Sequence, residues 1–141
     1  MPLESDEEIA TLLTTSRTIA LVGASAKPER DSYAVMSFLQ AQGYRVIPVN
    51  PGLAGQILLG EMVASTLADI KEPIDIVDIF RNSDAAGQII DQAIGVHARA
   101  IWMQLGVINP QGADRAEAAG LKVVMDRCPK IEIPRLGLLK L

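Results

Sequence analysis

Val22-Gly23-Ala24-Ser25-Ala26-Lys27-Pro28-Glu29-Arg30-Asp31-Ser32 is the most informative segment of this chain. It follows an apolar segment, residues 18–22, and precedes a segment of helical periodicity, residues 33–42. An apolar strand that enters a glycine turn and then a helix is typical of the first βαβ unit of a nucleotide-binding sheet. Glycine lets the backbone approach a phosphate, and a helix start offers N–H groups and the positive end of its dipole. The stretch therefore predicts a phosphate-binding turn.

The turn departs from the usual dinucleotide fingerprint, in which three glycines follow the pattern G-x-G-x-x-G. Only Gly23 is present, Ser25 stands at the place of the second glycine, and Lys27 and Arg30 add two cations. The next apolar segment ends at Val49-Asn50-Pro51, so it carries no carboxylate for the ribose hydroxyls of NAD. These features predict a phosphate-rich nucleotide other than NAD.

Apolar and amphipathic segments alternate along the whole chain. The predicted strands are residues 18–22, 45–49, 74–80, 100–104 and 122–125. The predicted helices are a short one after the capping box Ser5-Asp6-Glu7-Glu8, then residues 33–42, 84–94 and 110–119, and a proline-punctuated tail closes the chain. Ser83 or Asn82 is expected to cap the helix of residues 84–94, and Asn109 that of residues 110–119. Residues 51–60 are expected to form a loop with one short helical turn. Strands rich in Val, Ile and Leu that alternate with helices predict a parallel sheet covered on both faces. We expect one α/β domain over residues 1–141, a three-layer, Rossmann-like, doubly wound parallel sheet of about five strands.

Composition narrows the functional classes. The chain has 141 residues, 49% of them hydrophobic, and a formal net charge of -4 without a basic stripe, which argues against nucleic-acid binding. Cys128 is the single cysteine, so an intrachain disulfide is impossible. Residues 1–8 are acidic, whereas a signal peptide begins with basic residues that are followed by apolar ones. The apolar runs of the chain are far shorter than the roughly 20 residues of a membrane helix. We therefore expect a cytoplasmic protein without a membrane partner.

The carboxyl ends of the predicted strands carry the remaining candidates, because ligands bind at that edge of such sheets. Arg81, Gln104 and Arg127 make this edge polar. His97, the single histidine, lies in a polar turn without a fixed partner in sequence, and no Cys/His cluster has metal-ligand spacing. Trp102 is expected in the core rather than as a stacking platform.

Several sequence blocks taken together resemble one family. They are Val22-Gly23-Ala24-Ser25, Pro28-Glu29-Arg30-Asp31-Ser32, Gly43-Tyr44-Arg45-Val46-Ile47-Pro48-Val49-Asn50-Pro51, Asp75-Ile76-Val77-Asp78-Ile79-Phe80-Arg81, Trp102-Met103-Gln104-Leu105-Gly106 and Asp126-Arg127-Cys128-Pro129. These blocks are similar to those of the small bacterial and archaeal CoA-binding proteins, which are single-domain relatives of the CoA-binding domain of the succinyl-CoA synthetase α subunit. The resemblance implies coenzyme A, or an acyl-CoA, as the ligand. Asp31 and Ala64 depart from the residues of many relatives, Pro and Tyr respectively.

The resemblance also implies a set of ligand contacts. Backbone and hydroxyl donors of the turn would contact the pyrophosphate, and the cationic side chains of the turn would contact phosphate groups. The ends of the second and third strands would border adenosine and pantetheine. The implied contact residues are Gly23, Ala24, Ser25, Lys27, Arg30, Ser32, Asn50, Pro51, Ile79, Phe80, Arg81 and Gln104.

Two classes of function stay open on the sequence. A non-catalytic CoA-binding or regulatory module is favoured, because no nucleophile with a base, no metal cluster and no second domain is evident. An NADP-dependent oxidoreductase, or the nucleotide-binding domain of a multi-component enzyme, is the alternative, with Arg30 or Lys27 on the 2′-phosphate. Cys128 is either a small packing residue or a thiol that faces the ligand. The apolar tail, residues 131–139, docks on the chain's own core or on a second copy in a homodimer.

Overall fold

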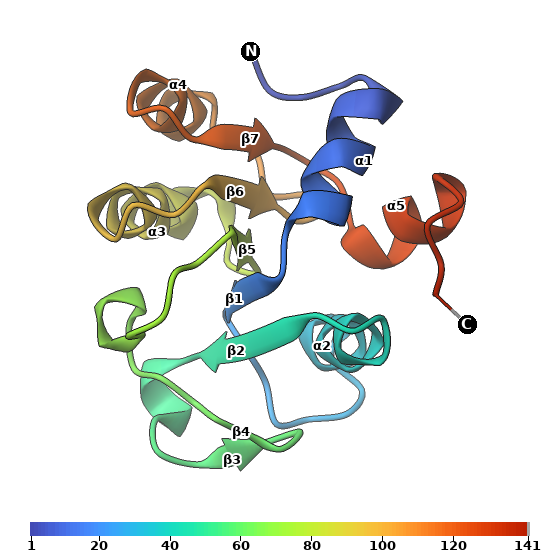
Figure 1. The fold of residues 1–141 in the computed structure, drawn as a ribbon. Helices are drawn as coiled ribbons and strands as arrows, with labels where there is room; N and C mark the ends of the chain where they lie inside the picture. The colour runs from blue at the N-terminus through green and yellow to red at the C-terminus, as the bar shows by residue number, and fades with distance from the viewer. Residues whose placement is uncertain (141) are drawn as a thin grey trace.

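A parallel sheet of five strands runs through the middle of the protein, and the computed structural model describes residues 1–140 (Figure 1). In chain order its strands are β1 (Thr18–Val22), β2 (Arg45–Val49), β5 (Ile76–Ile79), β6 (Ala100–Met103) and β7 (Lys122–Val124). In space they lie in the order β2-β1-β5-β6-β7, and every neighbouring pair is parallel. The predicted doubly wound sheet is confirmed.

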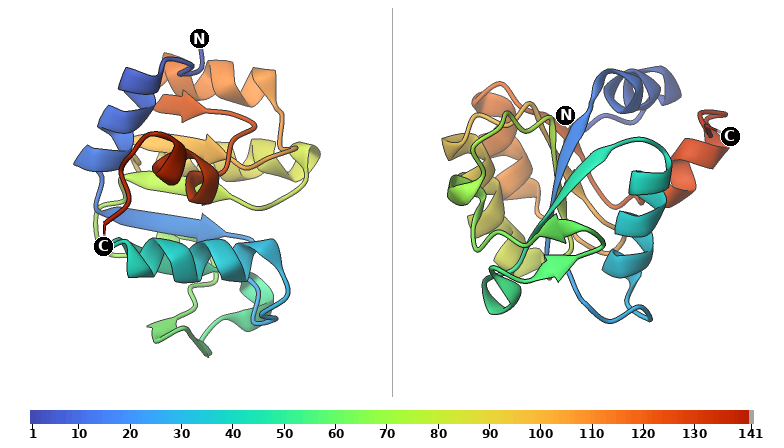
Figure 2. Two further views of the ribbon diagram at one scale, coloured as in Figure 1. Left: turned by 90° about the vertical axis from the view of Figure 1, so that its right-hand side faces the viewer. Right: turned by 60° about the horizontal axis from the view of Figure 1, so that its bottom comes forward.

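Helices cover both faces of this sheet. Within residues 1–140 they are α1 (Asp6–Thr15), α2 (Asp31–Ala41), α3 (Ser83–Gly95), α4 (Pro110–Ala118) and α5 (Pro129–Arg135). Helices α1, α2 and α5 lie on one face, and α3 and α4 lie on the other (Figures 1 and 2). The molecule therefore has the three layers that the alternation of strands and helices predicts.

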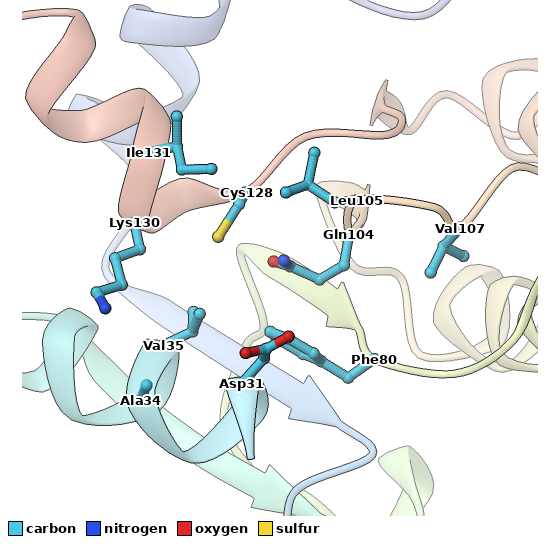
Figure 3. Close-up of a pocket in the computed structure, with 10 residues that line it drawn as sticks. All are labelled: Asp31, Ala34, Val35, Phe80, Gln104, Leu105, Val107, Cys128, Lys130 and Ile131. Carbon is cyan, nitrogen blue, oxygen red and sulfur yellow. The ribbon is translucent and has the colours of Figure 1, made fainter. Parts of the chain in front are cut away.

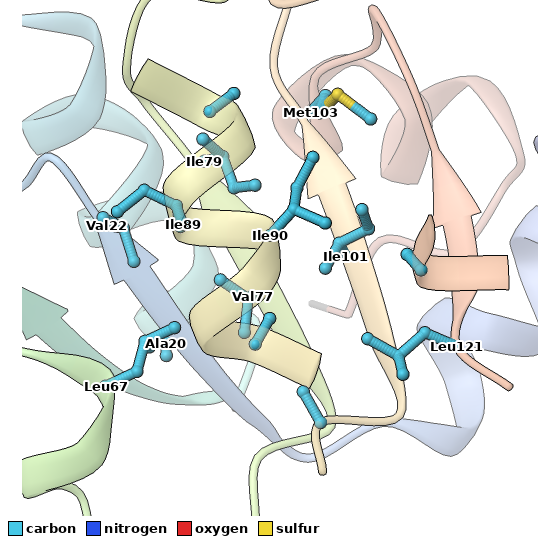
Figure 4. Close-up of a cluster of buried hydrophobic side chains, with 14 of the residues drawn as sticks. Ala20, Val22, Leu67, Val77, Ile79, Ile89, Ile90, Ile101, Met103 and Leu121 are labelled. Atoms are coloured by element: carbon cyan, nitrogen blue, oxygen red, sulfur yellow. The ribbon is translucent and has the colours of Figure 1, made fainter. Parts of the chain in front are cut away.

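Alternate strand residues supply the two halves of the core. Val77 and Ile79 of β5 pack against Ile89 and Ile90 of α3 on one face (Figure 4). Residues of opposite parity, such as Ile76, pack on the face of α1, α2 and α5. Because both faces are covered, each central strand is buried along its whole length, which explains its near-continuous apolar sequence.

Three helices begin at side chains that the sequence suggested as caps. The Ser5 hydroxyl accepts the N–H of Glu8, and the Asn82 and Asn109 side chains accept N–H groups in the first turns of α3 and α4. These bonds satisfy donors that a helix start otherwise leaves free. Helix α2 differs, because its N-cap residue Arg30 makes no side-chain capping bond.

Two segments differ from the prediction. Residues 51–60, expected as a loop with one helical turn, contain a 3-10 turn, η1 (Pro51–Leu53), and also an antiparallel hairpin of β3 (Ile57–Leu58) and β4 (Glu61–Met62). Its two-residue turn has φ of 49° at Leu59 and 84° at Gly60. Two positive φ values suit a hairpin turn, but the first position usually holds Asn or Asp, so Leu59 concealed the signal.

The tail after β7 is the second difference, because it forms helix α5 instead of an irregular segment. Pro129 fits its first position, and the helix ends one residue after Pro134, which explains why the prolines read as a break. Ile133 of α5 is buried on the face of α1 and α2. The tail therefore docks on the chain's own core.

The order of the strands fixes where a ligand can enter. Strands β1 and β5 are neighbours, yet the helices that follow them, α2 and α3, lie on opposite faces of the sheet (Figure 1). Beyond the carboxyl ends of β1 and β5 the chain therefore diverges in two directions. In sheets of this kind ligands bind at such a switch point.

Candidate functional site

The turn after β1 is held tightly against the ends of its two neighbouring strands. Gly23 has φ of 92°, and a Cβ atom built on it would overlap the carbonyl oxygen of Phe80. The N–H groups of Gly23 and Ala24 both donate to the carbonyl of Val49, at 3.0 and 3.3 Å. The close approach of the end of β5 therefore requires glycine at position 23, whether or not a phosphate binds at the turn.

This bonding changes the part that the turn can play toward a pyrophosphate. The sequence predicted donors from Gly23 and Ala24, but their N–H groups are already engaged, and the Ala24 side chain is buried. The Ser25 hydroxyl lies further along the turn and accepts the N–H of Lys27 at 3.1 Å. Within the turn, donors to a phosphate can therefore come only from residues after Ala24.

Asn50 acts as a tether between β2 and the turn. Its Nδ2 donates to the carbonyl of Ala24 at 2.8 Å, and its Oδ1 accepts the N–H of Gly52 at 2.8 Å. The amide nitrogen and the amide oxygen of Asn50 thus each have a hydrogen-bond partner within the protein. Asn50 therefore fixes the position of the turn relative to β2, whether or not a ligand is bound. Pro51 follows it as the exposed first residue of η1.

The start of α2 offers the free donors of the site. The first N–H groups of an α-helix lack intrahelical partners, and Arg30 supplies no capping side chain. The side chains of Lys27 and Arg30 are exposed, and neither forms an ion pair within residues 1–140. Ser32, in the first turn, is 6% exposed. Uncapped N–H groups beside two unpaired cations are suited to an anion.

One pocket, here named the β2–α3 pocket, lies beside this turn on the face of α3. Its volume is about 470 Å³, and its polar lining is supplied by three different parts of the chain. The lining residues are Val22, Gly23, Val49, Asn50, Pro51, Ser65, Thr66, Arg81, Gln88, Ile89 and Gln92. It thus collects four of the predicted contacts, Gly23, Asn50, Pro51 and Arg81.

A second pocket, the α2–α5 pocket, opens on the other face of the sheet (Figure 3). Its volume is about 420 Å³. Its lining residues are Asp31, Ala34, Val35, Phe80, Gln104, Leu105, Val107, Cys128, Lys130 and Ile131. Two predicted contacts, Phe80 and Gln104, lie here, on the opposite face from Arg81.

Two predicted edge residues do not face either pocket. The Ile79 side chain is fully buried in the core beneath α3, so only its backbone is left for the predicted ligand path. Arg127 is held by Glu132, with Nη1 donating to Oε1 at 2.9 Å, and its carbonyl accepts the Nε1–H of Trp102. Trp102 is fully buried, as predicted.

One ionisable side chain, Asp78, lies in the core of the sheet and lines neither pocket. Asp78 of β5 lies between Leu21 and Trp102 in the register of the sheet, is fully buried, and neither carboxylate oxygen has a partner within residues 1–140. Burial raises the pKa of Asp78 well above its usual value. Because it is fully buried, this carboxyl is not open to a ligand as an acid or base.

The sequence analysis missed the polar side chains of α3. Gln88 and Gln92 are four residues apart and therefore lie on one side of the helix, next to the apolar Ile89. This spacing was a usable signal, because a glutamine pair at the edge of an apolar face borders a crevice. Ser65 and Thr66 precede η2 (Leu67–Asp69) and meet the pocket because residue 64 pairs with the end of β2.

The described residues contain neither a cluster of metal-ligating side chains nor a helix that could span a membrane. Residues 1–140 hold no group of three or more His, Cys, Asp and Glu side chains placed to bind a metal ion. Over the same residues, no helix combines the length and the apolar composition that crossing a membrane requires.

The chain is similar to known proteins over most of its length. Residues 17–134 match the family model described as CoA binding domain. The YneT protein of Bacillus subtilis is 36% identical over 127 residues, which are 90% of this chain and 93% of YneT. A solved structure from Pyrococcus horikoshii is 38% identical with a TM-score of 0.90, and covers 96% of each chain. One from Thermus thermophilus is also 38% identical with a TM-score of 0.90, over 94% of this chain and 99% of that chain.

Proposed function

This chain belongs to the CoA binding domain family, and from that premise we propose that it binds coenzyme A or an acyl-CoA as a non-catalytic module. The ligand would lie along the carboxyl edge of the sheet, at the switch point between β1 and β5. The phosphates of CoA would anchor the ligand, and the two pockets would hold the rest of the molecule.

The observation that carries the proposal is the uncapped start of α2 next to two unpaired cations. Lys27 and Arg30 stand in the turn that leads into this helix, and no side chain caps its N-terminus. A net charge of -4 offers no general attraction to anions, so a local cluster of donors must hold them. The pyrophosphate of CoA supplies the oxygens that such a cluster prefers.

The β2–α3 pocket suits the nucleotide end of the ligand. Asn50 and Pro51 border it at the end of β2, where such sheets hold adenosine, and Arg81 gives it a cation for a further phosphate. Gln88 and Gln92 add amide donors and acceptors for a base or a sugar. The absence of a carboxylate at Asn50 disfavours the ribose recognition of NAD.

The distribution of nucleophiles and bases supports binding rather than turnover. Cys128 borders the α2–α5 pocket at the carboxyl edge, whereas His97 is exposed in the turn before β6, at the amino edge of the sheet. A thiol and an imidazole at opposite edges cannot act as a nucleophile with its base. A module that holds CoA without transforming it is consistent with this placement.

The test is selective stabilisation of the full chain by CoA. A ligand at 100 times its Kd that binds only the native state adds about 2.7 kcal/mol, so the Tm should rise by several degrees. CoA, dephospho-CoA, NADP and NAD are compared at equal concentration by thermal unfolding. We expect the largest rise with CoA and a smaller one with dephospho-CoA. A rise with NADP and none with CoA would contradict the proposal and favour an oxidoreductase.

A further inference from the structure

The α2–α5 pocket contains two groups that the proposed function leaves without a part. Cys128, the single cysteine, is 7% exposed and borders the pocket. Gln104 is 6% exposed, and its Oε1 has no hydrogen-bond partner in the described part of the chain. Both side chains point into the same space between α2 and α5 (Figure 3).

The unpartnered amide oxygen indicates what kind of group belongs in this pocket. Burying a carbonyl oxygen without a donor costs free energy, so a ligand N–H at Oε1 of Gln104 is favoured. Val35, Phe80 and Val107 form the apolar part of the surrounding wall, and the two charged lining residues, Asp31 and Lys130, are exposed. An apolar wall with one buried acceptor suits a neutral, flexible chain that carries amide N–H groups. The pantetheine arm of CoA is such a chain, and it ends in a thiol.

A close backbone contact joins one lining residue of each pocket. Gly23 borders the β2–α3 pocket, Phe80 borders the α2–α5 pocket, and the carbonyl of Phe80 lies directly against Gly23. Asp31, the first residue of α2, also borders the α2–α5 pocket. A ligand anchored by its phosphates at the start of α2 can therefore reach one pocket with its nucleotide and the other with its arm.

We propose that the α2–α5 pocket receives the thiol end of the pantetheine arm, and that Cys128 forms a mixed disulfide there when CoA arrives as CoA disulfide. The inference rests on the proposed function. The Cys128 thiolate attacks one sulfur of CoA disulfide, the sulfur–sulfur bond of that molecule breaks, and a bond between Cys128 and one CoA forms. The second CoA leaves as a thiolate and takes up a proton. CoA disulfide is the oxidant, and an added thiol reverses the step.

Selectivity in this reaction comes from binding. His97 is at the opposite edge of the sheet, and Arg127 is held by Glu132. Lys130 borders the pocket together with Cys128, but it is present for either disulfide and so does not distinguish them. A disulfide that the pocket holds close to Cys128 reacts faster because its sulfur is already positioned. A small disulfide without a nucleotide lacks this advantage. The rate with CoA disulfide should therefore exceed the rate with oxidised glutathione.

The experiment measures the intact mass of the full chain during incubation with CoA disulfide or with oxidised glutathione at the same concentration. We expect addition of one CoA, at least about tenfold faster than addition of glutathione, removal by dithiothreitol, and no addition to Cys128→Ser. Equal rates with the two disulfides, or addition of CoA to Cys128→Ser, would overturn the proposal.

A substitution of the buried amide tests the pocket itself. Gln104→Met keeps the length of the side chain and removes the acceptor, so labelling by CoA disulfide should slow by about five- to tenfold while labelling by oxidised glutathione stays unchanged. Gln111→Met is the matched control, because Gln111 is exposed on α4 and borders neither pocket. Equal labelling of the two variants would overturn the assignment of the arm to this pocket.

Free CoA separates failure of this inference from failure of the proposed function. If CoA raises the Tm and CoA disulfide labels no faster than oxidised glutathione, CoA binds but its thiol lies elsewhere, and only the inference fails. If CoA does not raise the Tm and CoA disulfide labels Cys128 no faster than oxidised glutathione does, both fail. Stabilisation of Cys128→Ser by CoA to the same extent as the wild type, together with selective labelling of the wild type, supports both.

Discussion

The α-carbon of Gly23 faces the carbonyl of Phe80 so closely that the structure leaves no room for a side chain between them. A Cβ atom at Gly23 would overlap the Phe80 oxygen and lie 2.9 Å from the Phe80 carbonyl carbon. The same contact divides the β2–α3 pocket from the α2–α5 pocket. It therefore links the stability of the central sheet to the shape of the proposed CoA site.

We expect Gly23→Ala to destabilise the protein by more than its backbone conformation alone explains. Gly120 offers a matched control, because its φ of 91° nearly equals the 92° of Gly23 while no atom lies within 4 Å of its built Cβ. Gly120→Ala should cost about 1 to 2 kcal/mol for the left-handed backbone. Gly23→Ala should cost at least about 1 kcal/mol more, since β1 and β5 must move apart. Urea unfolding of both variants measures the difference, and equal losses would contradict the contact.

Removing the cation at the start of α2 should weaken CoA binding without unfolding the domain. Arg30→Ala removes a charge-assisted hydrogen bond and should cost about 1.5 to 3 kcal/mol of binding free energy, a loss that shrinks as salt rises. Ser25→Ala should cost less, near 1 kcal/mol. Arg17→Ala is the control, because Arg17 is exposed just before β1, at the amino edge of the sheet. Unchanged affinity of both turn variants in calorimetry would move the site away from this turn.

The buried carboxyl of Asp78 should make the protein less stable as pH rises. Its pKa in the folded state is raised well above the ordinary 3.8 by burial, so between these two values the folded chain binds a proton that the unfolded chain has lost. Stability then falls by about 1.4 kcal/mol per pH unit until the folded pKa is reached. Asp78→Asn, which cannot ionise, should be similar to the wild type near pH 4 and more stable at pH 7.

Urea unfolding between pH 4 and pH 8 measures this divergence. Asp114→Asn is a suitable control, because Asp114 is exposed on α4. A constant difference between the wild type and Asp78→Asn across the range would show that the Asp78 carboxyl does not change its protonation on folding.

The carboxylate of Glu132 should contribute stability that disappears in acid. The hydrogen bond from Arg135 lowers the pKa of Glu132 most, burial opposes it, and a bond from Arg127 lowers it further. A folded pKa below the ordinary 4.5 means that the contribution is present above pH 4.5 and lost as pH falls through the folded pKa. Glu132→Gln should cost about 2 kcal/mol at pH 7 and much less at pH 3. Thermal unfolding at both values tests this, and an equal loss at both would exclude the ionic origin.

Local patterns predicted the strands and four of the helices well. Residues 18–22 and 45–49 coincide with β1 and β2, and Asn82 and Asn109 cap α3 and α4 as expected. These features depend on neighbours in sequence, because apolar periodicity and capping act over one or two turns. Helix α5 and the β3–β4 hairpin escaped, since Pro134 and Leu59 are unusual residues at their positions and packing overrides their preference.

For the site, the sequence predicted candidate residues but not which of them share a pocket or form hydrogen bonds with one another. Arg81 and Gln104 both follow central strands, yet one borders the β2–α3 pocket and the other the α2–α5 pocket. Gly23 and Arg127 donate hydrogen bonds to Val49 and Glu132 respectively, and Val49 lies on another strand. Such pairings depend on which distant segments the fold brings together, and hydrophobic periodicity does not specify this.

The order of apolar, small and polar residues along the chain is enough to specify a parallel α/β sheet with a glycine turn before a helix. Long-range packing, in contrast, sends the helices after β1 and β5 to opposite faces of the sheet, with a pocket on each. The same packing placed Cys128 and the free oxygen of Gln104 in one space and buried Asp78 in the sheet. The reason is that burial and side-chain pairing follow from contacts between segments far apart in the chain, and such contacts exist only once the sheet has assembled.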